Sequence, residues 1–134
     1  MENSGAIFAI GAAIIIPIIL LLTNKVVKVR HERITSEREN AARELEIKIR
    51  MASGIGVVND FNELARVYCE LGRFADAEKC MQKAVSITEN ELGQMEPTLA
   101  PILDNYASVL DKMNRTVEGD KYRKRARELA SKRQ

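Results

Sequence analysis

The chain has 134 residues, about the length of one domain. It is 46% hydrophobic and 30% charged, with only 4% aromatic residues and no tryptophan, a composition typical of helical proteins. The 21 basic residues are nearly matched by 19 acidic ones, and the formal net charge is +2. Because the two signs are interspersed, the composition argues against nucleic acid as a partner.

The first element is an apolar run over residues 6–22, AIFAIGAAIIIPIILLL, which contains no charged or hydrogen-bonding side chain. With Gly5 and Thr23 it approaches the roughly 20 residues that span a bilayer. The start of the chain, MENS, carries no basic residue, which favours a retained anchor over the alternative of a cleaved signal peptide. The sequence therefore predicts a transmembrane anchor at 1–23, spanning the bilayer at about 5–23.

The charges beside this run predict its orientation. No Lys or Arg precedes it, whereas four follow it closely, namely Lys25, Lys28, Arg30 and Arg33. By the positive-inside rule the sequence predicts a single-pass membrane protein with its N-terminus outside and the rest of the chain cytoplasmic. Small residues recur every four positions, at Gly5, Ala9 and Ala13. They suit close packing of another membrane helix, although such residues are also common in spanning helices.

Residues 24–53 read as a charged juxtamembrane helix or linker. Residues 24–50 contain no Gly or Pro, and acidic residues precede basic ones by four positions in Glu39–Arg43, Glu44–Lys48 and Glu46–Arg50. The basic residues nearest the apolar run would lie beside lipid head groups, which makes the lipid bilayer a predicted partner. Gly54 and Gly56 then interrupt the helix.

Residues 54–134 contain an internal repeat with an offset of 42 residues, whose copies cover about 58–91 and 100–133. The offset pairs Phe61 with Leu103, Leu64 with Tyr106, Ala65 with Ala107, Tyr68 with Leu110, and Ala84 with Ala126. Each copy predicts two helices, joined by turns at 71–74 and 113–116. The small residues Ala65 and Ala77, then Ala107 and Gly119, predict close helix crossings.

Further marks of the first copy are Gly72, Phe74, Ile87 and the connector from Glu91-Leu92-Gly93 to Pro97. With these residues the repeat resembles the tetratricopeptide repeat, and more closely the longer 42-residue repeats of the kinesin light chain type. The second copy has Asn114 in place of the turn glycine and Gly119 in place of an alanine. The resemblance implies an all-α fold with two helical hairpins, a short α-solenoid. It rests on Leu64, Ala65, Tyr68, Gly72, Phe74, Ala77, Ala84, Ile87, the connector from Glu91-Leu92-Gly93 to Pro97, Tyr106, Ala107 and Ala126.

The resemblance also implies protein or peptide binding along an inner face, formed by the first helix of each hairpin. Asn105 stands where related repeats often place an asparagine that binds a ligand backbone, and an amide can donate and accept at once. An ordinary solvated helix face is the alternative interpretation. The implied partner-binding residues are Asn62, Arg66, Asp104, Asn105, Ser108 and Lys112.

Catalysis is not predicted. The sequence has no nucleophile motif and a single histidine, His31, and its two cysteines, Cys69 and Cys80, have no partner at metal-ligand spacing. The acidic residues stand mostly beside basic ones in predicted solvated helices. We therefore expect no enzyme activity, no catalytic residues, no cofactor and no metal.

Two functions remain. The first is an accessory or scaffolding subunit of a larger membrane complex, and the alternative is an adaptor that recruits a soluble client or peptide to the cytoplasmic membrane face. Because about three repeats are usually needed to bury a continuous core, something must cover the ends of these two. The candidates are residues 35–52 as an extra half-repeat, a second copy of the chain in a homo-oligomer, or other subunits of the complex.

Overall fold

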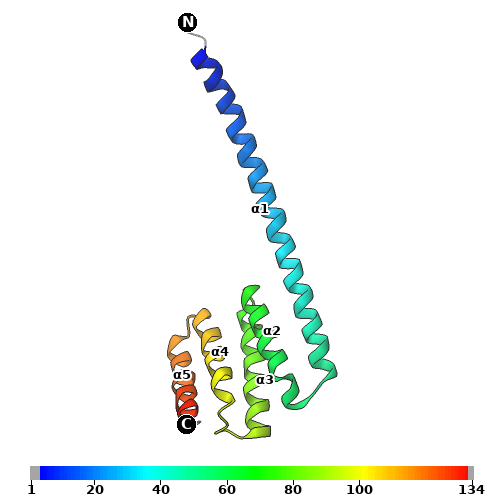
Figure 1. Ribbon diagram of the computed structural model, residues 1–134, viewed down its shortest axis with the longest axis vertical. Coiled ribbons are helices and arrows are strands. Elements are labelled where there is room, and N and C mark those ends of the chain that lie inside the picture. Colours follow the sequence, from blue (N-terminus) through cyan, green and yellow to red (C-terminus); the bar gives the residue numbers. More distant parts are fainter. Residues whose placement is uncertain (1–3, 133–134) are drawn as a thin grey trace. The chain divides into compact units, whose positions relative to one another are not determined.

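The computed structural model describes the backbone of residues 4–132 and the side chains of residues 13–132. Within these residues the chain is all helical, which confirms the predicted all-α class. In order along the chain, the elements are α1 (Ser4–Met51), the short 3-10 helix η1 (Gly54–Val57), α2 (Val58–Glu70), α3 (Phe74–Leu92), α4 (Leu99–Lys112) and α5 (Thr116–Ser131), as Figure 1 shows.

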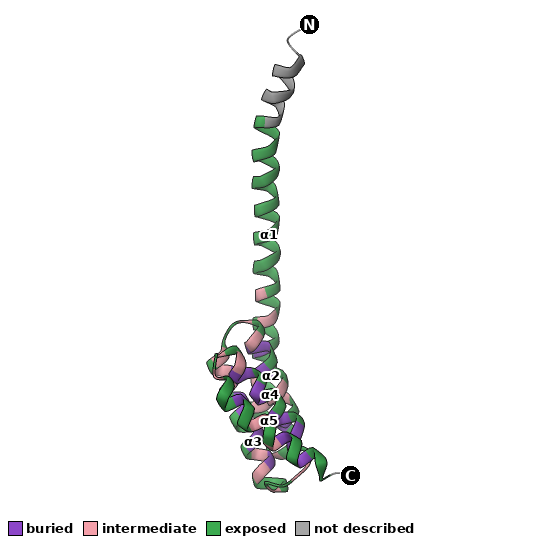
Figure 2. Cartoon of the chain, turned by 90° about the vertical axis from the view of Figure 1, so that its left-hand side faces the viewer, coloured by how far each residue is buried: buried purple, intermediate pink, exposed green. Residues whose placement is uncertain are grey.

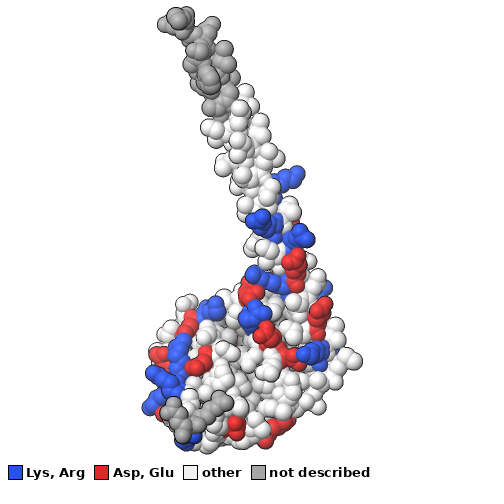
Figure 3. All heavy atoms as spheres, viewed as in Figure 1, with Lys and Arg blue, Asp and Glu red and all other residues white. Residues whose placement is uncertain are grey.

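The predicted membrane topology is wrong. Among the residues that the structure describes, no helix is long and apolar enough to cross a membrane, which overturns the single-pass anchor at 5–23 and the cytoplasmic placement derived from it. The physical reason lies in the length of the run. The apolar run of residues 6–22 is 17 residues long, shorter than the roughly 20 that a span requires, and Lys25 follows closely. In Figure 3, the uncharged, white stretch of α1 is followed along the helix by charged side chains, drawn in blue and red.

The predicted small-residue stripe falls mostly outside the described side chains. Gly5 and Ala9 precede residue 13, the first residue whose side chain is described, and Ala13 is exposed. The helix predicted over residues 24–50 is confirmed as part of α1. Along it, Lys28 pairs with Glu32 at 3.9 Å and Arg33 pairs with Glu37 at 3.2 Å, both one turn apart and exposed.

The chain divides into two compact units, residues 1–37 and residues 38–134. In the second unit, the end of α1 packs antiparallel against α2. Arg38 pairs with Glu70 at 3.0 Å and Lys48 pairs with Asp60 at 2.6 Å, while Ala42 between them is only 3% exposed. Residues 38–51 thus take the place of an extra half-repeat and cover one end of the repeat core.

The two predicted hairpins, α2–α3 and α4–α5, are present, and their turns fall where the sequence places them. In the first turn the N–H of Arg73 donates to the carbonyl of Tyr68 at 2.8 Å. In the second, the N–H of Arg115 donates to the carbonyl of Leu110 at 2.9 Å. These four residues match under the 42-residue offset, so the two turns share one hydrogen-bonding pattern.

The core is formed by all four helices of the hairpins, and Figure 2 shows the buried residues gathered in this part of the chain. Small residues allow the close crossings, because Ala77 and Ala107 are fully buried and a Cβ on Gly119 would lie 3.1 Å from the carbonyl oxygen of Ala107. Large apolar side chains fill the remaining space, chiefly those of Met81, Leu99, Leu103, Leu110 and Leu129.

Candidate functional site

The inner face of the repeat unit is formed by α2 and α4 and contains a shallow groove of about 190 Å³. The structure brings five of the six predicted partner-binding residues to this groove. They are Asn62, Arg66, Asn105, Ser108 and Lys112. The sixth, Asp104, is exposed but does not line the groove, and its backbone carbonyl accepts a hydrogen bond from the Ser108 hydroxyl at 3.0 Å.

Two amide side chains face each other across the groove. The Nδ2 of Asn105 on α4 donates to the Oδ1 of Asn62 on α2 over 3.4 Å, a long hydrogen bond. Asn105 is exposed and Asn62 is half-buried. Because each amide offers two donors and an acceptor with two lone pairs, most of their hydrogen-bonding capacity is left for another molecule. The pair is suited to contact a peptide backbone.

The two basic residues of the groove differ in their surroundings. Arg66 is held on α2 by Glu63 at 2.9 Å and by Glu70 at 2.6 Å, and the hydrogen bond that Arg66 donates to Glu63 is the main reason that the pKa of Arg66 is raised. Lys112, at the end of α4, is exposed and forms no ion pair within residues 13–132. Lys112 is therefore the cation of the groove that remains available to a ligand.

The floor of the groove is apolar, and sequence reasoning missed it. It is formed by Ala65, Cys69, Met81 and Val109, contributed by α2, α3 and α4. Burial raises the pKa of the Cys69 thiol, while the charge of Lys112 opposes that shift. The one available signal was the helical spacing of Ala65 and Cys69, since Met81 comes from another helix and its approach depends on the packed fold.

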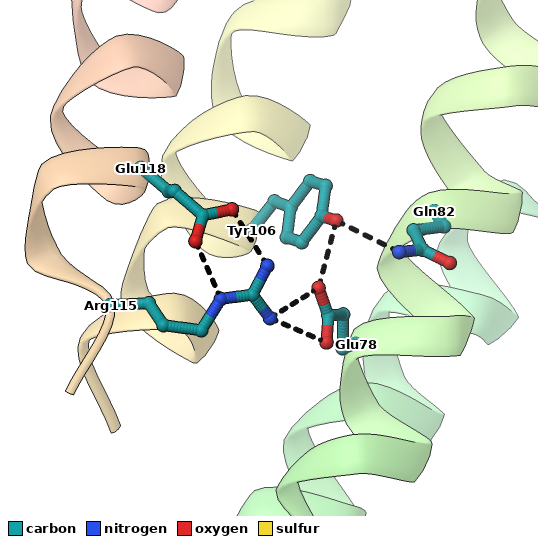
Figure 4. Close-up of polar contacts among 5 residues, drawn as sticks. All are labelled: Glu78, Gln82, Tyr106, Arg115 and Glu118. Carbon is teal, nitrogen blue, oxygen red and sulfur yellow. Dashed lines mark hydrogen bonds and ion pairs between the residues drawn. The ribbon is translucent and has the colours of Figure 1, made fainter. Parts of the chain in front are cut away.

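A polar network joins the two hairpins to each other (Figure 4). Arg115, in the second turn, donates to both carboxylate oxygens of Glu78 on α3 at 2.8 and 2.9 Å, and it pairs with Glu118 on α5 at 2.7 Å. The Tyr106 hydroxyl donates to Glu78 at 3.3 Å and accepts from Gln82 at 3.2 Å. Burial raises the pKa of Tyr106 to about 12, so it remains a donor at neutral pH.

The network is structural in character. Hydrogen bonding to Arg115 lowers the pKa of Glu118, and hydrogen bonding to Glu118 and then Glu78 raises the pKa of Arg115. Glu118 and Arg115 are therefore both stabilised in their ionised forms, unlike the poised acid or base that proton transfer requires. Among the residues that the structure describes, no group of three or more His, Cys, Asp or Glu side chains is placed to hold a metal ion.

Comparison with protein families agrees with the two helical hairpins. Residues 59–132 match the family described as Tetratricopeptide repeat, and this match covers more than half of the chain, from α2 to α5. A comparison with curated proteins gives no match. The repeats of this family generally mediate binding to other proteins. With both hairpins inside the matched region, the chain belongs to the tetratricopeptide repeat family.

Proposed function

We propose that the chain is a non-enzymatic protein-interaction subunit that binds an extended segment of a partner protein along the groove between α2 and α4. The observation that carries the proposal is the pair of Asn62 and Asn105, whose amides face each other above an apolar floor. An extended segment exposes amides and carbonyls in alternation, and these two side chains can bind both kinds of group.

The support around the groove favours a preformed site. Arg66 is fixed by two carboxylates, and Arg38 pairs with one of these, Glu70, from the end of α1. The network of Glu78 and Arg115 holds α3 against the α4–α5 hairpin. Because the walls are held by contacts within the chain, a bound segment would lose conformational entropy while the groove would lose little.

The proposal is tested with a displayed library of random 12-residue peptides, selected on the intact chain. We expect enriched peptides to bind the wild-type protein and to lose at least tenfold in affinity on Asn105→Ala, since a backbone clamp is removed. The matched control is Asn90→Ala, an exposed asparagine on α3 outside the groove. Equal binding to the two variants would refute the groove as the binding site.

A second candidate, permanent incorporation in a larger assembly as an accessory or scaffolding subunit, is favoured by a different observation. Apolar side chains from residue 14 to residue 29 of α1 are exposed, for example Leu21 at 69% and Val27 at 65%. Contiguous exposed apolar surface of this kind marks a contact site. Other subunits, or a second copy of the chain, would cover it.

This candidate is tested by native mass spectrometry of the protein purified through a carboxyl-terminal tag. A built-in subunit would appear in a stoichiometric complex that persists in high salt, and Leu21→Ser with Val27→Ser would release it. The control is a second pair of serine substitutions at exposed isoleucines of α1 outside residues 14–29, Ile34→Ser with Ile47→Ser. A single chain in every preparation would leave the groove as the only interaction surface proposed.

We further propose that the repeats are of the longer, kinesin-light-chain-like type. The support is the 42-residue offset, which relates both the helices and the turn hydrogen bonds and exceeds the 34 residues of the standard repeat. In this proposal the interaction domain, residues 54–134, is completed by residues 38–51 of α1.

A further inference from the structure

A second cavity adjoins the groove. It has a volume of about 430 Å³, more than twice that of the groove, and Asn62 lines both. Its walls come from η1, α2, the end of α3, the α3–α4 connector and the start of α4. The apolar members of the lining are Ile55, Val58, Leu92, Pro97, Pro101 and Ile102.

The wall that η1 provides lies outside the helices of the two hairpins, and one carboxylate ties it to them. The backbone N–H of Ile55 donates to the carboxylate of Glu91, near the end of α3, at 2.9 Å. The preceding residue, Gly54, takes a left-handed conformation with φ 76°, and a Cβ there would lie 3.1 Å from the same carboxylate. The left-handed conformation at Gly54, which favours glycine, thus places η1 beside the end of α3.

The cavity is open to an apolar ligand group. Ile55 is 41% exposed and Leu92 is 47% exposed, whereas Val58 and Ile102 behind them are buried. A large aliphatic or aromatic side chain entering here would remove the two exposed side chains from water. The groove next to it also has an apolar floor, but it adds the paired amides and the available charge of Lys112.

The spacing of these two features fits one extended peptide. Ile102 and Lys112 lie ten residues apart on α4, and at 1.5 Å per residue this is about 15 Å. An extended chain advances about 3.3 Å per residue, so roughly four to five residues cover that distance. Asn62 and Asn105 would then contact the backbone between the two ends.

We propose that the partner segment carries a large apolar residue, seated in the cavity beside η1, and an acidic residue four to five positions away, beside Lys112. This inference rests on the proposed binding of an extended segment in the groove. Lys112 selects the acidic residue by charge complementarity, and the volume and lining of the cavity select the apolar one.

The experiment uses the peptides enriched from the displayed library on the intact chain. We expect them to share a Leu, Ile, Phe, Met or Trp four to five positions from an Asp or Glu. Replacing that apolar residue by Ala should weaken binding by roughly 10- to 100-fold, the effect of exposing a buried side chain of this size. Lengthening or shortening the spacing by two residues should weaken binding at least as much.

Variants of the protein assign each end of the peptide. Leu92→Asn should weaken binding of the parent peptide. It should not weaken further the binding of the peptide in which Ala replaces the apolar residue, because the contact with Leu92 is already lost. Its matched control is Met95→Asn, an exposed methionine that does not line the cavity. Lys112→Glu should reverse the preference for the acidic residue, whereas Lys83→Glu on the exposed side of α3 should not.

The outcomes separate this inference from the proposed function. Peptides that depend on Asn105 but lack the spaced pair, or that bind Leu92→Asn as tightly as wild type, would overturn the inference and leave the groove in place. Failure to enrich any peptide that depends on Asn105 would overturn the proposed function and the inference together.

Discussion

Asn114 takes the same left-handed backbone conformation as Gly72, the residue 42 positions before it. Their φ angles are 59° and 73°, and each N–H donates to the carbonyl three residues earlier, at 2.9 and 3.1 Å. Asparagine is the residue that tolerates this conformation best after glycine, so the replacement keeps the turn. The second hairpin therefore closes with the geometry of the first.

Substituting alanine at Gly72 should destabilise the fold by about 1–2 kcal/mol, the cost of a left-handed conformation for a residue with a Cβ. No heavy atom lies within 4 Å of the position of that Cβ, so the effect would come from the backbone alone. Urea unfolding measures it. The control is Gly56→Ala, which also has open space but no positive φ, and its free energy of unfolding should stay near wild type. Equal losses in both variants would contradict this explanation.

The end of α1 offers a prediction from two adjacent alanines. Ala42 is 3% exposed against the repeat unit, whereas Ala41 is exposed. Ala42→Leu should destabilise the second unit by about 1–3 kcal/mol through overpacking, while Ala41→Leu should change stability by less than about 0.5 kcal/mol. Urea unfolding of both variants provides the measurement. Similar stabilities would mean that residues 38–51 do not belong to the folded repeat unit.

The crossing of α4 and α5 predicts a similar contrast. A Cβ on Gly119 would lie 3.0 Å from the Oδ1 of Asp111 and 3.1 Å from the carbonyl oxygen of Ala107. Gly119→Val should cost about 1–3 kcal/mol, because α5 must move away from the α4 backbone. Ala130→Val, at an exposed position of the same helix, places the same side chain in solvent and should cost much less. Thermal unfolding that ranks the two variants in the opposite order would refute the close crossing.

The hairpins were predictable because their information is local and repeated. Ala65 and Ala107 are related by the 42-residue offset, and Gly72 lies in the first turn. The pattern therefore predicts the helices, the turns between them and the inner face. The same pattern placed Asn62 and Asn105 on one face. Their hydrogen bond depends on how α2 packs against α4, which no spacing within one helix encodes.

Other features depended on contacts that the sequence does not repeat. The end of α1 is joined to the repeat unit by polar contacts, including the hydroxyl of Tyr68 donating to Glu46, as well as by the few apolar residues Ala42, Leu45 and Ile49. The cavity beside η1 requires Gly54 and Glu91, 37 residues apart, to meet. The membrane prediction was wrong because it relied on the strong hydropathy of residues 6–22, whereas among the described residues no helix is apolar over a length that crosses a membrane.

The last prediction concerns pH and the ion pair of Arg115 with Glu118. Hydrogen bonding to Arg115 lowers the pKa of Glu118 from its ordinary value of 4.5. A carboxylate with a depressed folded-state pKa contributes stability that is present above its unfolded pKa and is lost as pH falls through the folded value. The denaturation midpoint in urea should therefore fall from pH 5 to pH 3.

Glu118→Gln should lower the midpoint at pH 7 and should show a smaller fall in acid, because its pair with Arg115 no longer titrates. Glu128→Gln, at an exposed position of α5 without an ion pair in the described part of the chain, is the matched control and should keep the wild-type pH profile. If Glu118→Gln retains the full acid dependence of the wild type, the ion pair contributes no stability and the position of the second turn is fixed by Glu78 and the backbone alone.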